Sequence, residues 1–125
     1  MQWLLLGIFG ALGTVLRRAV GLLAIRVLGE GLPYATLVAN LLGSFLLGML
    51  FVLGTGRTFL GVDARLLLGT GMMGGFTTYS SFNLETLLYF QQGASVRALV
   101  YVTATLLGCL AAGAAGLATA RLLST

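Results

Sequence analysis

The sequence has no histidine, no lysine and a single cysteine, and only three of its 125 residues are acidic. Without histidine, catalytic dyads and triads that use an imidazole base are excluded. Cys109 has no histidine or second cysteine to join it, which also excludes a zinc or haem site. It is embedded in apolar sequence, which indicates a small packing residue. No serine or threonine has an obvious base beside it, so the sequence predicts a protein that is not an enzyme.

Charge is scarce as well. Charged residues make up 8% of the chain, where a soluble domain has about 25%. Hydrophobic residues make up 58%, and the mean hydropathy is +1.04. The net charge of +4 comes from arginines that are scattered along the sequence, so no basic patch for nucleic acid is formed. These values predict an all-α integral membrane protein.

Four apolar segments are each close to the ~20 residues that cross a bilayer. We expect helices over residues 3–28, 33–53, 63–90 and 95–123, within a single transmembrane domain that spans residues 1–125. The first segment does not resemble a cleavable signal, because its arginines follow the apolar run instead of preceding it. No linker, repeat or low-complexity tract interrupts the chain.

The third segment contains a stretch that is unsuited to a continuous helix. Gly74 and Gly75 are poor helix formers, and Thr77 and Thr78 carry β-branched hydroxyls that compete for backbone hydrogen bonds. A helix break in a membrane is tolerated only where it is buried in protein or lines a cavity. We therefore predict that the third helix is broken in mid-membrane and that the break is the functional centre.

Small residues recur at fixed spacing in all four segments, most clearly in the fourth. There they occupy every fourth position, as Ala104, Gly108, Ala112, Gly116 and Ala120. This spacing lets membrane helices approach closely. Four close-packed helices leave little room for a cavity within one chain, so a pore is expected at a dimer interface.

Polar side chains inside the apolar segments form a second group. Tyr101, Thr105 and Cys109 make a stripe beside the seam, each four residues apart. The Thr105 hydroxyl can bond to its own helix backbone or face a polar path. Asn40 lies in the middle of the second segment, where its amide must find partners. It either bonds to another helix or faces a permeant species.

Arg17 and Arg18 are the most costly residues in the first segment, since a central arginine costs at least ~2.5 kcal/mol in a membrane. Adjacent residues point about 100° apart on a helix. One side chain can therefore extend to the membrane surface while the other faces a wet vestibule, where its charge would concentrate anions.

The remaining arginines give no clear membrane orientation. If the N-terminus marks one side, that side holds Arg57, Arg65 and Arg121, whereas Arg26 and Arg97 lie on the other. The positive-inside rule then has almost no preference. The chain could insert both ways, and the two orientations could pair antiparallel.

Three motifs of this sequence resemble the Fluc (CrcB) family of fluoride channels, and the resemblance covers all four segments. The motifs are Gly13-Thr-Val-Leu-Arg17-Arg18, Thr36-Leu-Val-Ala-Asn40-Leu-Leu-Gly43-Ser-Phe-Leu-Leu-Gly48 and Gly74-Gly-Phe-Thr-Thr-Tyr-Ser-Ser-Phe82-Asn-Leu-Glu85. The resemblance implies a fluoride-selective channel that lowers cytoplasmic fluoride by passive export. It further implies an antiparallel dual-topology homodimer with two pathways, which crosses the inner (plasma) membrane several times.

The resemblance also implies roles for single residues. A central structural sodium ion would be held by the backbone carbonyls of Gly74 and Thr77. The fluoride pathway would be lined by Asn40, Tyr79, Ser80 and Phe82, with Tyr101 and Thr105 at its exit and Arg17 at its vestibule.

The chain departs from the family pattern at four positions, none of which removes a functional group. Tyr79 replaces the usual phenylalanine, Ala35 a glycine, Ala39 a valine and Arg18 an aromatic residue. The edge of a tyrosine ring can still face an anion, because aromatic edges are positive. The resemblance assigns no role to Glu85.

Two other readings of the composition remain. A small multidrug exporter also has four helices and dual topology, but it needs a membrane-embedded carboxylate, for which Glu85 is the sole candidate. A non-conducting membrane subunit would explain the tight packing but gives no use for the helix break.

Overall fold

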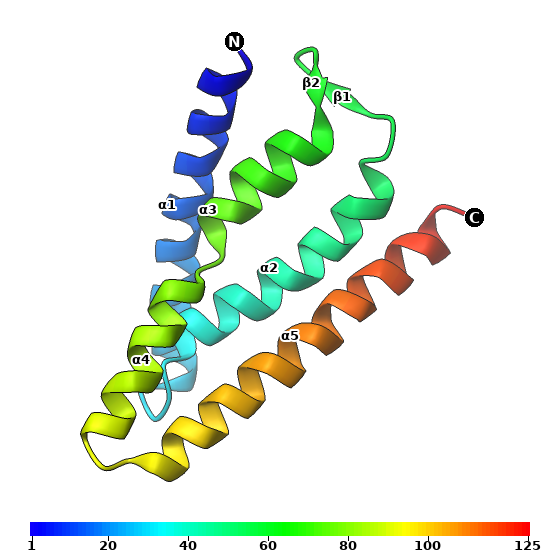
Figure 1. Ribbon diagram of the computed structural model, residues 1–125. Coiled ribbons are helices and arrows are strands. Elements are labelled where there is room, and N and C mark those ends of the chain that lie inside the picture. The colour runs from blue at the N-terminus through cyan, green and yellow to red at the C-terminus, as the bar shows by residue number, and fades with distance from the viewer.

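The computed structural model describes all 125 residues of the chain, and most of them are helical (Figure 1). Its elements in order are α1 (Gln2–Leu28), α2 (Tyr34–Leu53), β1 (Thr58–Phe59), β2 (Val62–Asp63), the π-helix η1 (Arg65–Met73), α3 (Gly74–Phe76), α4 (Tyr79–Gln91) and α5 (Ser95–Leu123). The ends of α1, α2 and α5 lie within one residue of the positions expected from the sequence.

Helices α1, α2 and α5 are each long and apolar enough to cross a membrane. The prediction of an all-α membrane protein is therefore confirmed. The third apolar segment is divided differently, into nine residues of η1, three of α3 and 13 of α4. At 1.5 Å per residue, a 13-residue helix reaches about 20 Å, which is less than the ~30 Å hydrocarbon core. Neither half of this segment crosses the bilayer by itself.

The break in the third segment lies at Thr77 and Thr78, which are extended, with ψ of 158° and 116°. The break predicted for the stretch of Gly74, Gly75, Thr77 and Thr78 is present, and it falls at the two threonines; the two glycines do not interrupt the helix. Both lie in α3, and Gly74 has helical angles of φ −60° and ψ −39°. At Gly75, the missing side chain lets α3 pack closely against α1, because a Cβ atom there would overlap the carbonyl oxygen of Gly10.

The connection from α2 to η1 differs from the expected loop. Its residues form a short antiparallel hairpin in which Thr58 pairs with Asp63 and Phe59 with Val62. Leu60 and Gly61 both have positive φ, the conformation that joins two strands with a matching twist. The helix then begins at Arg65 instead of Asp63, whose carboxylate accepts a hydrogen bond from the Arg65 N–H at 2.7 Å.

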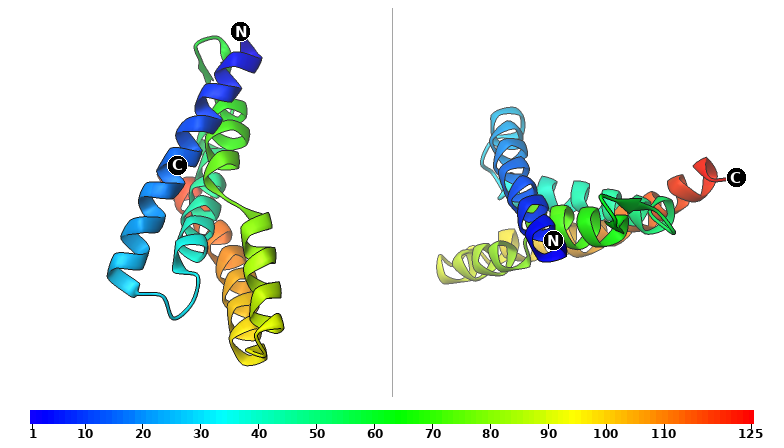
Figure 2. Two further views of the ribbon diagram at one scale, coloured as in Figure 1. Left: turned by 90° about the vertical axis from the view of Figure 1, so that its left-hand side faces the viewer. Right: turned by 90° about the horizontal axis from the view of Figure 1, so that it is seen from above.

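Helices α2 and α5 lie side by side, and α1 crosses the other face of α2 and η1 (Figures 1 and 2). The close approach predicted for the small residues of the fourth segment is confirmed at Gly116, where a Cβ atom would overlap the carbonyl oxygen of Phe45. The view from above in Figure 2 shows the helices splayed apart at their ends, with α4 directed away from the C-terminal end of α5.

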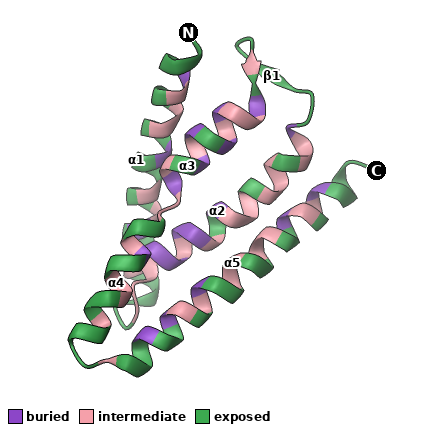
Figure 3. Cartoon of the chain, viewed as in Figure 1, coloured by how far each residue is buried: buried purple, intermediate pink, exposed green.

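Few side chains are shielded within one chain. Only 22 of the 125 residues are buried, and they are spread over α1, α2, η1 and α5, with a dense group in the first half of α2 (Figure 3). Tyr79, the first residue after the break, is 74% exposed. A membrane-spanning chain with so little buried surface leaves most of its apolar side chains to face lipid or another protein surface.

Candidate functional site

The amide side chain of Asn40 closes the broken backbone. Its Nδ2 donates to the Thr78 carbonyl oxygen at 3.0 Å, and its Oδ1 accepts from the Thr78 N–H at 2.8 Å. Asn40 thus gives the extended residue the pair of hydrogen bonds that a neighbouring strand would supply. Of the two roles that the sequence allowed, the bond to another helix is the one observed. One N–H of the amide is left over for a further partner.

Thr78 also caps the helix that follows it. Its Oγ1 accepts from the Ser81 N–H at 3.2 Å, as expected for a threonine N-cap, and the Ser81 hydroxyl lies 3.2 Å away. The first turn of α4 therefore begins at the break, with its backbone N–H groups directed toward it. A helix N-terminus carries partial positive charge and favours anions.

Aromatic rings surround this N-terminus. The rings of Phe82 and Tyr79 meet edge to face, with centroids 5.8 Å apart, and Phe82 meets Tyr101 in the same way at 5.2 Å. Phe82 is 6% exposed and belongs to a buried cluster with Leu37 and Tyr101. The break is thus followed by a stack of ring edges that runs from the exposed Tyr79 toward α5.

A cavity of about 410 Å³, here called the central cavity, lies between α2, the break and α5. The predicted site residues among its lining are Asn40, Thr77, Tyr79, Phe82 and Thr105. This cavity is open to the surroundings of the chain and is lined in part by exposed side chains, so it does not contradict the expectation that one chain leaves little internal room.

Thr105 is the unusual member of this lining. It is 6% exposed, and its Oγ1 has no hydrogen-bond partner. Other membrane threonines in the chain do bond to their own helix, as Thr86 does to the Phe82 carbonyl oxygen at 2.8 Å. Thr105 makes no such bond, so a hydroxyl without a partner lies next to the central cavity.

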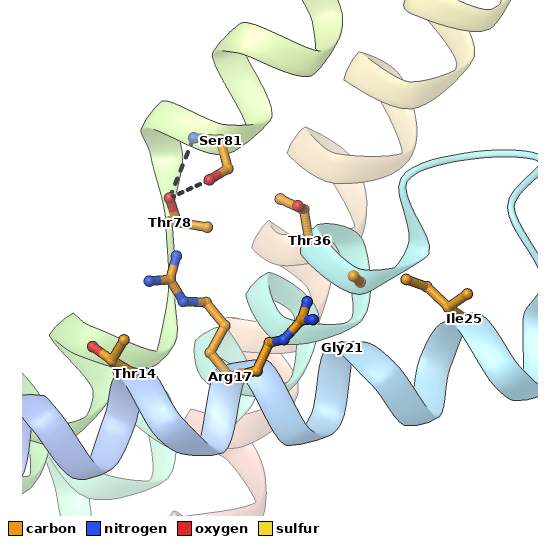
Figure 4. A pocket seen from close by; sticks show the side chains of 9 residues that line it. Thr14, Arg17, Gly21, Ile25, Thr36, Thr78 and Ser81 are labelled. Atoms are coloured by element: carbon orange, nitrogen blue, oxygen red, sulfur yellow. Dashed lines mark hydrogen bonds between the residues drawn. The ribbon is translucent and has the colours of Figure 1, made fainter.

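A second cavity of about 270 Å³, here called the arginine cavity, lies between α1, α2 and the start of α4. Arg17 and Arg18 both line it, together with the hydroxyl residues Thr14, Thr36, Thr78 and Ser81. Figure 4 shows Thr78 and Ser81 across the cavity from Arg17 and Thr14.

The sequence suggested that one arginine faces a vestibule while the other extends away, but here both line one cavity. Thr78 belongs to both cavities and so marks where they adjoin.

Glu85 links three helices through hydroxyl groups. Its carboxylate accepts from the Thr36 Oγ1 and from the Tyr101 hydroxyl, each at 2.9 Å. Tyr101 is fully buried and Thr36 is 8% exposed. Neither Thr36 nor Glu85 was among the predicted site residues. Glu85 is the only acidic residue inside an apolar segment, and that signal alone could have marked it as functional.

The structure brings some predicted residues together and leaves others apart. Ser80 is exposed and lines neither cavity, although its hydroxyl lies 3.4 Å from that of Thr78. Tyr101 lies behind Phe82 and bonds to Glu85, outside the lining of the central cavity. Gly74 is exposed.

Comparison with known proteins shows the family of the chain. The model of the family described as CrcB-like protein, camphor resistance (CrcB), matches residues 4–117. A protein of Rhizobium etli named fluoride-specific ion channel FluC is 42% identical over 98% of both chains. A protein of the same name from Agrobacterium fabrum is 43% identical over 90% of both chains. Another from Anaeromyxobacter dehalogenans is 46% identical over 87% of this chain and 86% of the relative. The match covers every helix that builds the two cavities, so the chain belongs to the CrcB family.

Proposed function

We propose that this protein is a fluoride-selective ion channel that lowers cytoplasmic fluoride by passive export across the inner (plasma) membrane. The observation that carries the proposal is the helix break held by Asn40, which places ring edges, a helix N-terminus and an unpaired hydroxyl around one cavity. The curated relatives named fluoride-specific ion channels support the choice of anion.

The anion enters through the arginine cavity. Two guanidinium groups in a recess with low-dielectric walls raise the local concentration of anions. The hydroxyls of Thr78 and Ser81 lie on the opposite wall and are oriented by the α4 cap. They can replace the first water molecules that the ion loses.

The anion then passes the break into the central cavity. Fluoride is small and strongly hydrated, and burying an ion without partners costs many kcal/mol. The spare Asn40 N–H, the edges of Tyr79 and Phe82, and the free Thr105 hydroxyl supply donors and positive edges in sequence. Ser80 lies beside the path, next to the Thr78 hydroxyl, and Tyr101 supports Phe82 from behind.

Glu85 acts as a positioning residue in this account. Its two hydroxyl bonds hold α4 against α2 and α5 and fix the Tyr101 ring beside Phe82. A carboxylate that already accepts two hydrogen bonds repels a passing anion less than a free one, because its charge is partly neutralised. No proton transfer is required.

The chain crosses the membrane four times if the two halves of the third segment, η1–α3 and α4, together form one span. The η1–α3 unit runs from the hairpin to the break, and α4 continues from the break to the turn before α5 (Figure 1). Together they cover the distance that α1, α2 and α5 each cover alone.

We also place the functional unit as an antiparallel dual-topology homodimer with one pathway on each side of the contact. Tyr79 at 74% exposure and the exposed Gly74 lie at the break, where a second copy would cover them. The even distribution of arginines removes any preferred orientation.

Dual topology predicts that a reporter fused to the C-terminus appears on both sides of the membrane. A cytoplasm-active and a periplasm-active reporter should each give signal in separate cultures, at comparable expression. Adding three lysines to one end should bias the signal to one side, because positive loops remain inside. A reporter active on one side alone, with the unaltered chain, would rule out dual topology.

The break offers carbonyl oxygens that would suit a structural sodium ion. The Gly74 carbonyl oxygen loses its ordinary helical partner, since the Thr78 N–H donates to Asn40 instead. Likewise the Ser81 N–H, the usual partner of the Thr77 carbonyl oxygen, donates to the Thr78 hydroxyl. Carbonyl oxygens suit a hard cation. Two of them from each copy would give four ligands, and the ion would add positive charge near the anion path.

One assay separates the channel from the two alternatives. The channel releases fluoride but not chloride from loaded liposomes, down the gradient. A multidrug-type exporter releases neither anion and needs a proton gradient, and a non-conducting subunit also releases neither. Glu85 is bonded to two hydroxyls, which disfavours its use as a proton carrier.

A further inference from the structure

The arginine cavity contains two positively charged side chains and no negatively charged one. Arg17 and Arg18 both line it, and none of the three acidic residues of the chain does. Arg17 is partly exposed and Arg18 is exposed, so an ion that enters can reach both guanidinium groups. Adjacent residues point about 100° apart on a helix, so the two groups approach the cavity from different directions. No carboxylate in the lining neutralises these two charges.

The opposite wall offers one hydroxyl proton that the protein does not use. Thr78 donates its hydroxyl proton to the Ser81 Oγ at 3.2 Å, and the Ser81 N–H donates to the Thr78 Oγ1 (Figure 4). The hydroxyl proton of Thr36 goes to Glu85, and that of Thr14 goes to its own helix backbone. A hydroxyl has a single proton to donate. The Ser81 O–H is therefore the hydroxyl donor of this lining that remains for a ligand.

These donors suit a tetrahedral oxyanion. A guanidinium group presents its N–H donors as a planar fork that can bind two oxygens of one phosphate group. Two forks that approach from different directions match an ion whose oxygens point in several directions. The cavity of about 270 Å³ also has room for such an ion together with some of its water, since one water molecule takes about 30 Å³.

We propose that the arginine cavity binds a phosphate group that carries close to two negative charges, and that the bound group blocks the entry of fluoride. The block rests on the proposed function, whereas the binding does not. Arg18 is the specificity-determining residue, because it adds a second positive charge with which a dianion interacts more strongly than a monovalent ion does. Free inorganic phosphate and the headgroup of phosphatidic acid share this chemistry.

Binding is measured by isothermal titration calorimetry of the purified full-length protein in detergent, with inorganic phosphate as the probe. Wild-type protein should bind phosphate, and Arg18→Gln should weaken the affinity by roughly tenfold or more. Arg18→Lys keeps the charge but loses the fork, so its affinity should lie between the two. Nitrate, a monovalent oxyanion, should bind far more weakly than phosphate at equal ionic strength.

The matched control is Arg97→Gln. It removes one exposed arginine charge from a position that lines neither cavity. Its phosphate affinity should equal that of wild-type protein. Size exclusion of all variants shows whether each protein is folded and keeps its oligomeric state.

The block is measured as fluoride release from phosphatidylcholine liposomes, with each protein compared with itself in external phosphate and in nitrate of equal ionic strength. At about ten times its dissociation constant, phosphate leaves roughly one tenth of the sites free, so wild-type release should fall roughly tenfold. The same phosphate concentration should slow Arg18→Gln much less. A second set of liposomes contains phosphatidic acid and no free phosphate. Slower release there from wild-type protein, but not from Arg18→Gln, would identify the lipid headgroup as a ligand.

Three results would overturn the proposal. The first is equal phosphate affinity of wild-type protein and Arg18→Gln, and the second is phosphate binding with unchanged flux. The third is the absence of phosphate binding together with no Arg18-dependent effect of phosphatidic acid. If untreated wild-type protein releases no fluoride, the proposed function fails, and the titration alone decides on the site. Arg18-dependent phosphate binding would then support the site, and its absence would overturn it.

Discussion

Replacing Asn40 with alanine is expected to stop fluoride release and to lower the melting temperature of the purified protein. The change leaves both the N–H and the carbonyl of Thr78 without their 2.8 and 3.0 Å partners in a part-buried segment. Each unpaired buried group costs about 1–3 kcal/mol. The break would then have no support from α2, and the lining of the central cavity would lose its fixed geometry.

Asn40→Asp separates the structural from the conducting role. Aspartate keeps an acceptor for the Thr78 N–H but loses the donor to the Thr78 carbonyl, and its charge faces the anion. It should therefore melt above Asn40→Ala yet release as little fluoride. Differential scanning fluorimetry and liposome efflux give the two readouts. Wild-type stability and flux in Asn40→Ala would show that the break does not depend on this amide.

Phe82→Ile is expected to slow fluoride release by roughly tenfold or more, where tenfold corresponds to about 1.4 kcal/mol in the barrier. Isoleucine keeps an apolar side chain at a position that is 6% exposed. It has no positive ring edge, and it ends the edge-to-face contacts with Tyr79 and Tyr101. Initial efflux rates per reconstituted protein measure the effect, after size exclusion shows that the oligomer is unchanged.

The matched control for Phe82 is Tyr79→Phe. It retains the ring and its edge and removes only a hydroxyl from a residue that is 74% exposed. It should keep or raise the rate, because the hydroxyl no longer needs a partner. Equal flux from wild type and Phe82→Ile would place the anion path away from these rings.

The sequence was a good guide to the membrane helices because apolar length is a local property. The ends of α1, α2 and α5 follow from where the apolar runs stop. The break was anticipated too, within the stretch from Gly74 to Thr78, but its exact position was not, because a lone sequence shows which residues resist a helix and not which ones find other partners. Thr77 and Thr78 leave the helix because Asn40, nearly 40 positions earlier, bonds to the Thr78 backbone.

The remainder of the site depends on contacts between helices. Glu85 meets Thr36 across 49 positions and Tyr101 across 16, and no local pattern encodes either bond. Likewise, the lack of a hydrogen-bond partner for the Thr105 hydroxyl depends on the residues around it and not on the sequence of its own helix. The short hairpin after α2 and the π-helical form of η1 were missed because tight turns and wide helices leave only weak sequence signals.

The most direct test of the account is ion release from liposomes that contain purified wild-type protein and are loaded with potassium fluoride or potassium chloride. A potassium ionophore lets potassium leave with the anion, so that no membrane potential builds up and stops the release. Ion-selective electrodes follow each anion. The account predicts rapid fluoride release and chloride release no faster than from protein-free liposomes. Fluoride release at the protein-free rate, or equal release of the two anions, would contradict it.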